Sequence, residues 1–80
     1  MGKFAGVAKV IGTKQTLKAV KEGKAVRVFL AEDTDEPIKK KIEDCCAEHS
    51  VPIESIESKI ELGRAGGIDR GAAVITILAV

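Results

Sequence analysis

The chain has no tryptophan and no tyrosine, and Phe4 and Phe29 are its only two phenylalanines. Proteins that hold single-stranded nucleic acid stack bases on aromatic side chains, so the sequence argues against that class. The one histidine, His49, stands at the end of a predicted amphipathic helix, with no nucleophile at a catalytic spacing. We expect it to have a role at the helix end, and we predict that the chain is not an enzyme.

Cysteine is also scarce, because the chain has two and they are adjacent, Cys45 and Cys46. Adjacent cysteines inside a predicted helix cannot build a disulfide framework, and they lack the C-x-x-C spacing of a zinc site. We expect at least one of them to be buried. The acids Asp33, Asp35 and Glu36 are better explained by helix capping than by cation binding. The sequence therefore predicts a reducing, cytoplasmic setting, no metal and no cofactor.

Long hydrophobic runs are absent. The longest stretch without a charged residue is the ten residues 71–80, about half of what a membrane-spanning helix needs. We therefore predict no membrane insertion. A chain of 80 residues has room for one core that buries roughly 60 to 65% of its unfolded surface, so residues 1–80 are interpreted as a single domain.

The charges are nearly balanced in number but not along the chain. The net charge is +1, yet residues 1–30 carry +6, residues 31–61 carry −6 and residues 62–80 carry +1. This asymmetry predicts a basic face that can meet phosphates and an acidic face that repels them. Charge alone leaves open that both are merely solvated faces of an ordinary domain, so the motifs must decide.

Hydrophobic periodicity predicts alternating strands and helices. The expected order is a strand at 7–11, a helix at 14–22, a strand at 25–31, a helix from caps at 33–35 to residue 49, a strand at 51–56, a short helix at 58–65 and a strand at 72–80. The strand at 25–31 is apolar almost throughout, which is typical of a central strand covered on both faces. The predicted fold is α/β, a three-layer α/β/α sandwich with a mixed central sheet of about four strands.

Capping residues support these boundaries. Thr13 is the expected N-cap of the first helix, and Gly23 the residue that ends it. Ser58 and Glu61 have the S-x-x-E spacing of a capping box. Pro52 favours the beginning of a strand or an edge strand, because proline cannot donate a ladder hydrogen bond.

Two distant segments carry residues suited to a nucleic-acid backbone. The first is Gly12 to Gln15 at a helix start, continued by the row Lys14, Lys18 and Lys21; the second is 63–71, GRAGGIDRG. The second segment lacks the G-K-[ST] ending of a P-loop and precedes a strand, so it is not an ATP site. Exposed helix amides, a lysine row and an arginine-bearing loop together favour phosphate binding. Without aromatic platforms, structured RNA read by its shape is the favoured target.

The segment 12–18, GTKQTLK, followed about fifty residues later by 62–71, LGRAGGIDRG, and an alanine-rich final strand, resembles the kink-turn-binding ribosomal protein family, especially its short bacterial members. The resemblance extends from Ala8 to Val80. It implies a three-layer sandwich that binds the kink-turn, an RNA duplex bent sharply at a bulge flanked by tandem sheared G·A pairs.

The resemblance also implies residue roles. Gly12 would let the backbone pass close to RNA, while Lys14 and Gln15 would reach the G·A edges. Ile68 would pack against an extruded bulge base, with Arg70 and nearby loop amides on the adjoining backbone. The implied RNA-binding set is Gly12, Thr13, Lys14, Gln15, Lys18, Arg64, Gly67, Ile68 and Arg70.

The sequence departs from the family pattern at two positions of this set and at Gly71, next to Arg70. Lys14 and Gln15 stand where many archaeal and eukaryotic members have asparagine and glutamate, and Gly71 stands where the eukaryotic protein has proline. Because lysine is longer and charged, we expect phosphate contacts to replace part of the base-edge contacts. Discrimination would weaken and salt dependence would rise.

The predicted function is binding of kink-turn structured RNA, ribosomal RNA or a riboswitch, so that its bent form is stabilised by a monomeric, ribosomal protein-like domain. One alternative is a protein-interaction or scaffold module of the same fold that uses the acidic middle segment and binds no specific RNA. A second is an enzyme accessory that presents RNA to a catalytic domain, but the sequence predicts no second domain.

Overall fold

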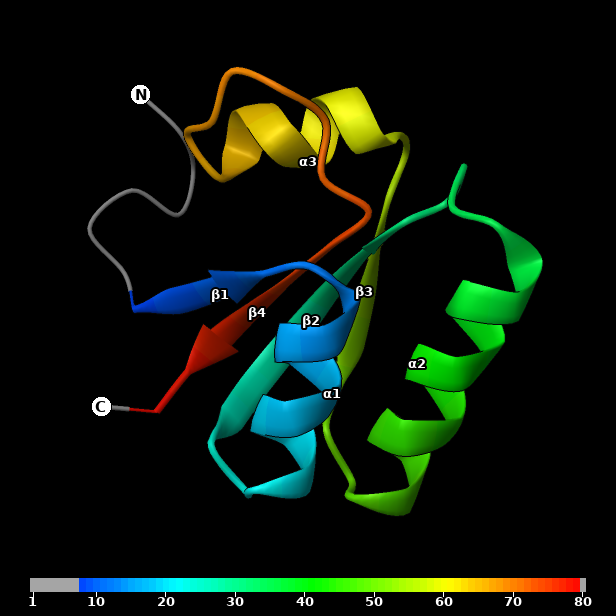
Figure 1. Cartoon of the computed structure of the whole chain (residues 1–80), viewed down its shortest axis with the longest axis vertical. Coiled ribbons are helices and arrows are strands. Elements are labelled where there is room, and N and C mark those ends of the chain that lie inside the picture. Colours follow the sequence, from blue (N-terminus) through cyan, green and yellow to red (C-terminus); the bar gives the residue numbers. More distant parts are fainter. Residues whose placement is uncertain (1–7, 80) are drawn as a thin grey trace.

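Four strands and three helices alternate along the part of the chain that the computed structural model describes, residues 8–79 (Figure 1). They are β1 (Lys9–Ile11), α1 (Thr13–Lys21), β2 (Ala25–Ala31), α2 (Glu36–Glu48), β3 (Ile53–Ile56), α3 (Lys59–Ala65) and β4 (Val74–Leu78). Every predicted element is found, although the last strand is shorter than expected. Position 7 of the first predicted strand lies outside the described residues, as does Phe4.

The strands form one sheet in the order β1-β4-β2-β3. β4 is antiparallel to both β1 and β2, whereas β2 and β3 are parallel and are joined through α2. This pattern confirms the mixed four-stranded sheet and the central position of β2. β3 lies at an edge, as Pro52 indicated, and the carbonyl of Pro52 still accepts a hydrogen bond from the Val28 amide at 3.0 Å.

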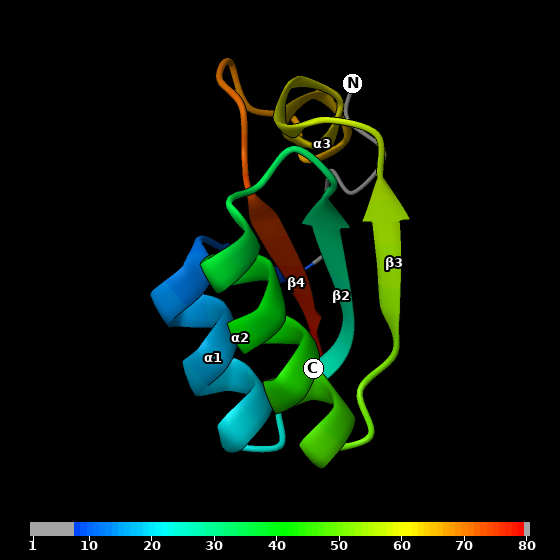
Figure 2. The same cartoon turned by 90° about the vertical axis from the view of Figure 1, so that its right-hand side faces the viewer.

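The sheet lies between two helical layers. α1 and α2 cover one face and α3 lies on the other (Figure 2), which confirms the α/β/α sandwich. Successive side chains of a strand point to opposite faces, so β2 contributes Val28 and Leu30 to one apolar cluster and Phe29 and Ala31 to another. The buried members on the α1–α2 side are Val20, Val28, Leu30, Ile42, Cys45, Cys46 and Val74, and those on the α3 side are Phe29, Ala31, Leu62, Ala72 and Ile75.

The two layers differ in extent. α3 has seven residues and is therefore about 10 Å long, so it covers only one end of its face (Figure 2). The first half of β2 lacks that cover: Val26 is 51% exposed, and the pairing with β4 is irregular between Ala25 and Arg27. The expectation that 25–31 is covered on both faces is thus wrong before Val28, because the helix that would cover it is short.

A buried polar contact ties α1 to the sheet. The hydroxyl of Thr76 in β4 donates a hydrogen bond to the hydroxyl oxygen of Thr16 in α1 at 2.8 Å, and both residues are fully buried. A buried hydroxyl without a partner is costly, so the pair fixes α1 against β4 in one position.

Helix starts differ in detail from the sequence expectations. Gly12, with φ of 111°, is the N-cap of α1, so Thr13 is the first helical residue and not its cap. The N-cap of α2 is Asp35, whose side chain makes no capping hydrogen bond. The Ser58 cap is confirmed, since its hydroxyl accepts from the Glu61 amide at 3.2 Å. Gly23 has φ of 73°, the left-handed conformation expected after a helix.

Both cysteines are buried and unbonded, which confirms their packing role. Burial, together with the neighbouring Cys45, raises the pKa of the Cys46 thiol to about 11. Cys46 is therefore protonated and unreactive at neutral pH. Within residues 8–79, no helix is long and apolar enough to cross a membrane, and no cluster of three metal-ligating side chains is present.

Candidate nucleic-acid interface

The two motifs that lie far apart in the sequence meet at one end of the sheet. The amide of Gly12, just before α1, donates a hydrogen bond to the carbonyl of Val74, the first residue of β4, at 3.0 Å. The segment 66–73, here called the glycine-rich loop, runs directly into β4. The structure therefore places the start of α1 beside the end of this loop.

The loop after α3 is held against that helix by backbone contacts. The Ile68 amide bonds to the carbonyl of Gly63, and the Ala72 amide bonds to the carbonyl of Lys59, each at 3.0 Å. A methyl group added to Gly63 would overlap the carbonyl oxygen of Arg70. The absence of a side chain at Gly63 thus lets the loop lie directly on the helix, and Arg70 is presented from a braced backbone.

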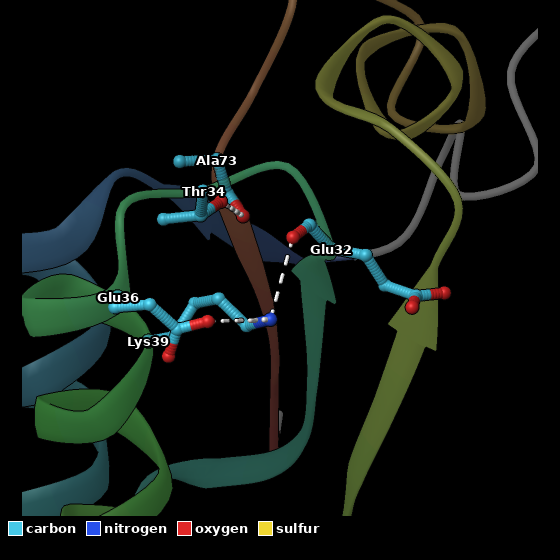
Figure 3. Close-up of polar contacts among 5 residues, drawn as sticks. All are labelled: Glu32, Thr34, Glu36, Lys39 and Ala73. Atoms are coloured by element: carbon cyan, nitrogen blue, oxygen red, sulfur yellow. Dashed lines mark hydrogen bonds and ion pairs between the residues drawn. The ribbon is translucent and has the colours of Figure 1, made fainter.

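A third segment, the β2–α2 connection, supports this end and was not assigned to the site from the sequence. The hydroxyl of Thr34 donates to the carbonyl of Ala73 at 3.4 Å, and Lys39 binds the carbonyl of Glu32 at 3.3 Å and the carboxylate of Glu36 at 3.8 Å (Figure 3). Thr34 is 5% exposed between acidic neighbours. A threonine flanked by two aspartates was interpreted as a cap, which concealed its contact with the loop.

Asp33 also binds a different helix from the one that the sequence indicated, which was α2. Its carboxylate accepts a hydrogen bond from the Lys59 amide at 2.9 Å, at the start of α3 and not of α2. The same Lys59 contributes its carbonyl to the loop through Ala72. The β2–α2 connection, α3 and the glycine-rich loop therefore form one continuous hydrogen-bonded frame.

The predicted residues of α1 divide by exposure. Lys14, Gln15 and Lys18 are exposed, whereas Gly12 and Thr13 are half-buried. Gln15 and Lys18 line a groove toward the β1–β4 edge, together with Val10, Ala19, Glu22, Lys24 and Leu78. The first turn of α1 contains no acid, and a lysine at a helix start is unfavourable to the helix dipole. An anion bound at the start of α1 would interact favourably both with the helix dipole and with the lysine.

The predicted loop residues lie together around a shallow hollow lined by Gly67, Ile68, Asp69 and Arg70. Gly67 has φ of 77°, a conformation that favours glycine. Arg70 is exposed, while Ile68 is half-buried and packs against the α3-side core. Ile68 therefore anchors the loop and also presents part of its side chain at the hollow.

Arg64 differs from the other predicted cations. Its guanidinium forms an ion pair with Glu61 on the preceding turn of α3 at 3.2 Å, and its side chain is 73% exposed. An exposed pair of this kind contributes little to stability. A phosphate would have to compete with Glu61 for Arg64, in contrast to Arg70.

Most cations of the described residues fall into two groups, and the half-buried Lys9 and Lys59 belong to neither. Lys24, Arg27, Lys39 and Arg64 are paired with Glu22, Glu54, Glu36 and Glu61, respectively. A second group has exposed side chains with no ion pair or hydrogen bond to another residue of 8–79: Lys14, Lys18, Lys21, Lys40, Lys41 and Arg70. Members of the second group lie on α1, on α2 and in the loop, so the exposed unpaired cations lie on the elements that carry the two motifs and on α2 beside them.

These features define a class of protein: a small α/β/α sandwich with a cationic surface at one end of its sheet. Backbone hydrogen bonds and closely packed glycines hold that surface in place. The comparison with known families makes the assignment specific. Residues 6–80 match the ribosomal protein L7Ae/L30e/S12e/Gadd45 family, and the chain belongs to this family. This confirms the resemblance inferred from the two motifs and the prediction that the chain is not an enzyme.

Similar bacterial proteins cover most of the chain. A protein of Geobacillus thermodenitrificans named RNA-binding protein is 51% identical over 69 residues, which are 86% of this chain and 84% of that protein. The RNA-binding protein YbxF of Geobacillus stearothermophilus is 48% identical over the same shares of the two chains.

Among solved structures, the 15.5kD RNA binding protein of Giardia lamblia matches with a TM-score of 0.82 at 33% identity, covering 91% of this chain and 62% of that one. A Bacillus halodurans protein of unknown function matches with a TM-score of 0.83 at 30% identity, covering 90% and 72%. The fold is thus shared between short bacterial chains and a longer eukaryotic relative.

Proposed function

We propose that the protein binds structured RNA at the end of the sheet where α1 and the glycine-rich loop meet, and that its preferred target is a kink-turn. In this proposal the protein holds the sharply bent form of the duplex and so shifts the RNA ensemble toward it. It does so without chemistry, as a ribosomal protein-like clamp. The names of the Geobacillus and Giardia relatives support RNA as the ligand.

The observation that carries the proposal is that exposed, unpaired cations lie at the end of the sheet where hydrogen bonds fix the glycine-rich loop. Lys14, Lys18 and Arg70 have exposed side chains without partners among residues 8–79. Gly12 joins the start of α1 to the start of β4. Phosphate groups are strong acceptors for such cations and for exposed amides at a helix start. A rigid arrangement of these groups can favour one RNA shape over another, which a flexible basic tail cannot.

The hollow beside the loop suggests how the bulge is accommodated. Ile68 supplies an apolar surface there, and Gly67 and Arg70 line the same hollow. An extruded base has an apolar face and can rest on such a side chain while its phosphate meets Arg70. Lys14 and Gln15 would lie along the adjacent base pairs, with Lys14 exchanging base-edge recognition for a phosphate contact.

The test is a binding titration against a kink-turn duplex and against the same duplex with its G·A pairs converted to Watson–Crick pairs, at two salt concentrations. A ligand shifts a conformational equilibrium only by its differential affinity. We expect the kinked RNA to bind at least about tenfold more tightly, which corresponds to about 1.4 kcal/mol. That preference should persist at the higher salt concentration.

The titration also separates the alternatives. Equal, salt-sensitive binding to both duplexes would replace the kink-turn proposal with nonspecific phosphate binding. Binding to neither would favour the protein-interaction module, whose contacts would then be sought on the acidic middle segment. Charge reversal at Lys18 provides the matched check, because it should reduce RNA affinity and leave an interaction through the acidic segment unchanged.

A further inference from the structure

The charges of α2 are divided along the helix. Lys39, Lys40 and Lys41 lie in its first half, Glu43, Asp44 and Glu48 lie in its second half, and the last turn has no basic residue. The helix dipole favours acids in the first turn, by about 0.3 to 1 kcal/mol each, and Asp35 at the N-cap and Glu36 follow this pattern. Lys40 and Lys41 lie beyond the first turn, so the dipole does not account for their placement.

The three lysines of α2 are not equivalent. Lys39 is only 21% exposed and binds both the Glu32 carbonyl and the Glu36 carboxylate, so it supports the β2–α2 connection. Lys40 and Lys41 are exposed and make no side-chain ion pair or hydrogen bond within residues 8–79. Asp44 lies four residues after Lys40, yet the two form no ion pair, consistent with the weaker orientation of such pairs.

The two unpaired lysines line a groove on the helical layer that also carries the lysine row of α1. α1 and α2 lie side by side, and both begin at the end of the sheet near the glycine-rich loop (Figure 2). The groove between them is lined by Lys21, Pro37, Lys40, Lys41, Asp44, Cys45, Glu48 and His49. Lys40 and Lys41 lie four and five residues after Glu36, the first residue of α2, so they are about 6 to 8 Å along the helix.

Resting on the proposed function, we propose that Lys40 and Lys41 bind the phosphate backbone of one duplex arm beyond the kink. The occupant is an RNA duplex because the contact is cationic, and Lys40 and Lys41 are exposed on the helix that packs beside α1, which carries Lys14. Asp44 and Glu48, farther along the groove, repel phosphate and limit the contact to the first half of α2. The protein thus has a footprint longer than the kink itself.

The experiment compares kink-turn duplexes whose arm on the α2 side is either cut back to the base pairs next to the bulge or extended by a full helical turn. Both arms of the RNA are tested in turn, and binding is titrated across salt concentrations. The double variant Lys40→Gln/Lys41→Gln is compared with Arg27→Gln, and changes are expressed per charge removed. The control removes an exposed cation that already has an acidic partner and lines none of the grooves described above.

For the wild-type protein, we expect the extended arm to improve affinity about five- to tenfold. The α2 variant should not show this improvement, and its slope of log K against log salt should fall by about 1 for each phosphate group that it no longer binds. The control should keep the improvement and the slope. Preference for the kinked over the Watson–Crick duplex should persist in both variants.

Identical behaviour of the α2 variant and Arg27→Gln, in arm-length dependence and in salt slope per charge removed, would overturn the arm contact while the kink preference still stood. If the wild-type protein showed no kink preference, the proposed function would fail first. The same two variants would then be compared on a plain extended duplex, where a lower slope for the α2 variant alone supports the arm contact and equal slopes overturn it.

Discussion

The two helical layers are attached to the sheet by different means. On the α1–α2 side, a broad apolar cluster and the buried pair of Thr16 and Thr76 hold the helices. On the α3 side, the apolar cluster is smaller, and backbone hydrogen bonds and the bare backbone of Gly63 fix the adjoining loop. The first layer mainly stabilises the fold, and the second mainly positions a surface.

This difference between the two layers predicts which substitutions should lower folding stability, which should lower RNA affinity, and which should lower both. A change in the α1–α2 core should remove the fold and the site together. A change at the α3–loop contact should move Arg70 relative to α1 while much of the fold remains. A change of an exposed site cation should remove binding alone. The following predictions test this division, from the largest to the smallest expected loss of folding free energy.

Val28→Asp should unfold the protein. Val28 is fully buried in β2, and an unpaired charge there costs more than about 4 kcal/mol. The control is Val26→Asp in the same strand, because Val26 is 51% exposed and its change should cost within about 1 kcal/mol. Circular dichroism with urea unfolding checks both, and similar losses would contradict the burial of Val28 and the exposure of Val26.

Gly63→Ala should destabilise the protein by about 1 to 3 kcal/mol, because the added methyl overlaps the Arg70 carbonyl. Helix propensity alone predicts the opposite sign, a stabilisation of about 1 kcal/mol. RNA affinity should fall as the loop is displaced. Gly23→Ala is the control, since its strain at φ of 73° lies in a turn away from the loop. Unchanged RNA affinity for Gly63→Ala would show that the close contact does not position the site.

Thr16→Val should cost about 1 to 3 kcal/mol, because the buried hydroxyl of Thr76 loses its hydrogen-bond partner. Replacing both threonines with valine should recover much of that loss, since no unsatisfied group remains. Thermal and urea unfolding measure the two effects. A double variant as unstable as the sum of the single changes would argue against a coupled pair.

Alkaline stability should report the burial of Cys46. The folded-state pKa of its thiol is about 11, above the ordinary value of 9.0, so the folded protein retains a proton that the unfolded chain releases. The contribution is fully present below pH 9 and is lost as the pH rises toward 11. Unfolding free energy of Cys46→Ala should fall less steeply over this interval than that of the wild-type protein. Parallel curves would contradict the prediction.

Arg70→Ala should leave unfolding free energy within about 0.5 kcal/mol, because the side chain is exposed. Its affinity for kink-turn RNA should nevertheless fall about tenfold, or about 1.4 kcal/mol. Titration and urea unfolding of the same preparation separate the two effects. A stability loss equal to that of Gly63→Ala would show that Arg70 belongs to the frame of the loop and not to its surface.

Much of this architecture could be predicted because local and global signals agree. Apolar periodicity indicated the elements, and Ser58 and Gly23 marked helix ends that the structure confirms. The exposed start of β2 could not be predicted, since it depends on how little of the sheet α3 covers. Composition alone would assign Val26 to the core, although it is 51% exposed.

The sequence indicates candidate site residues where they are close together in the chain, and says less where the fold joins distant segments. The motifs propose Lys14 and Arg70 as RNA contacts, which stays a prediction, and the Gly12–Val74 hydrogen bond brings the two motifs to one end of the sheet. Asp33 and Thr34 were interpreted as local caps, although they bind α3 and β4 neighbours 26 and 39 residues away. Such contacts depend on the order of the strands in the sheet, which a local sequence pattern does not reveal.

The central claim is that the protein holds RNA in its bent form, and energy transfer between dyes on the ends of the two arms tests it most directly. The RNA should be studied without divalent cations, so that the extended form predominates, while anisotropy reports binding. We predict that the protein raises the transfer efficiency of the kink-turn duplex and not that of its Watson–Crick counterpart. Binding to the kink-turn duplex without a rise in transfer efficiency would contradict the account.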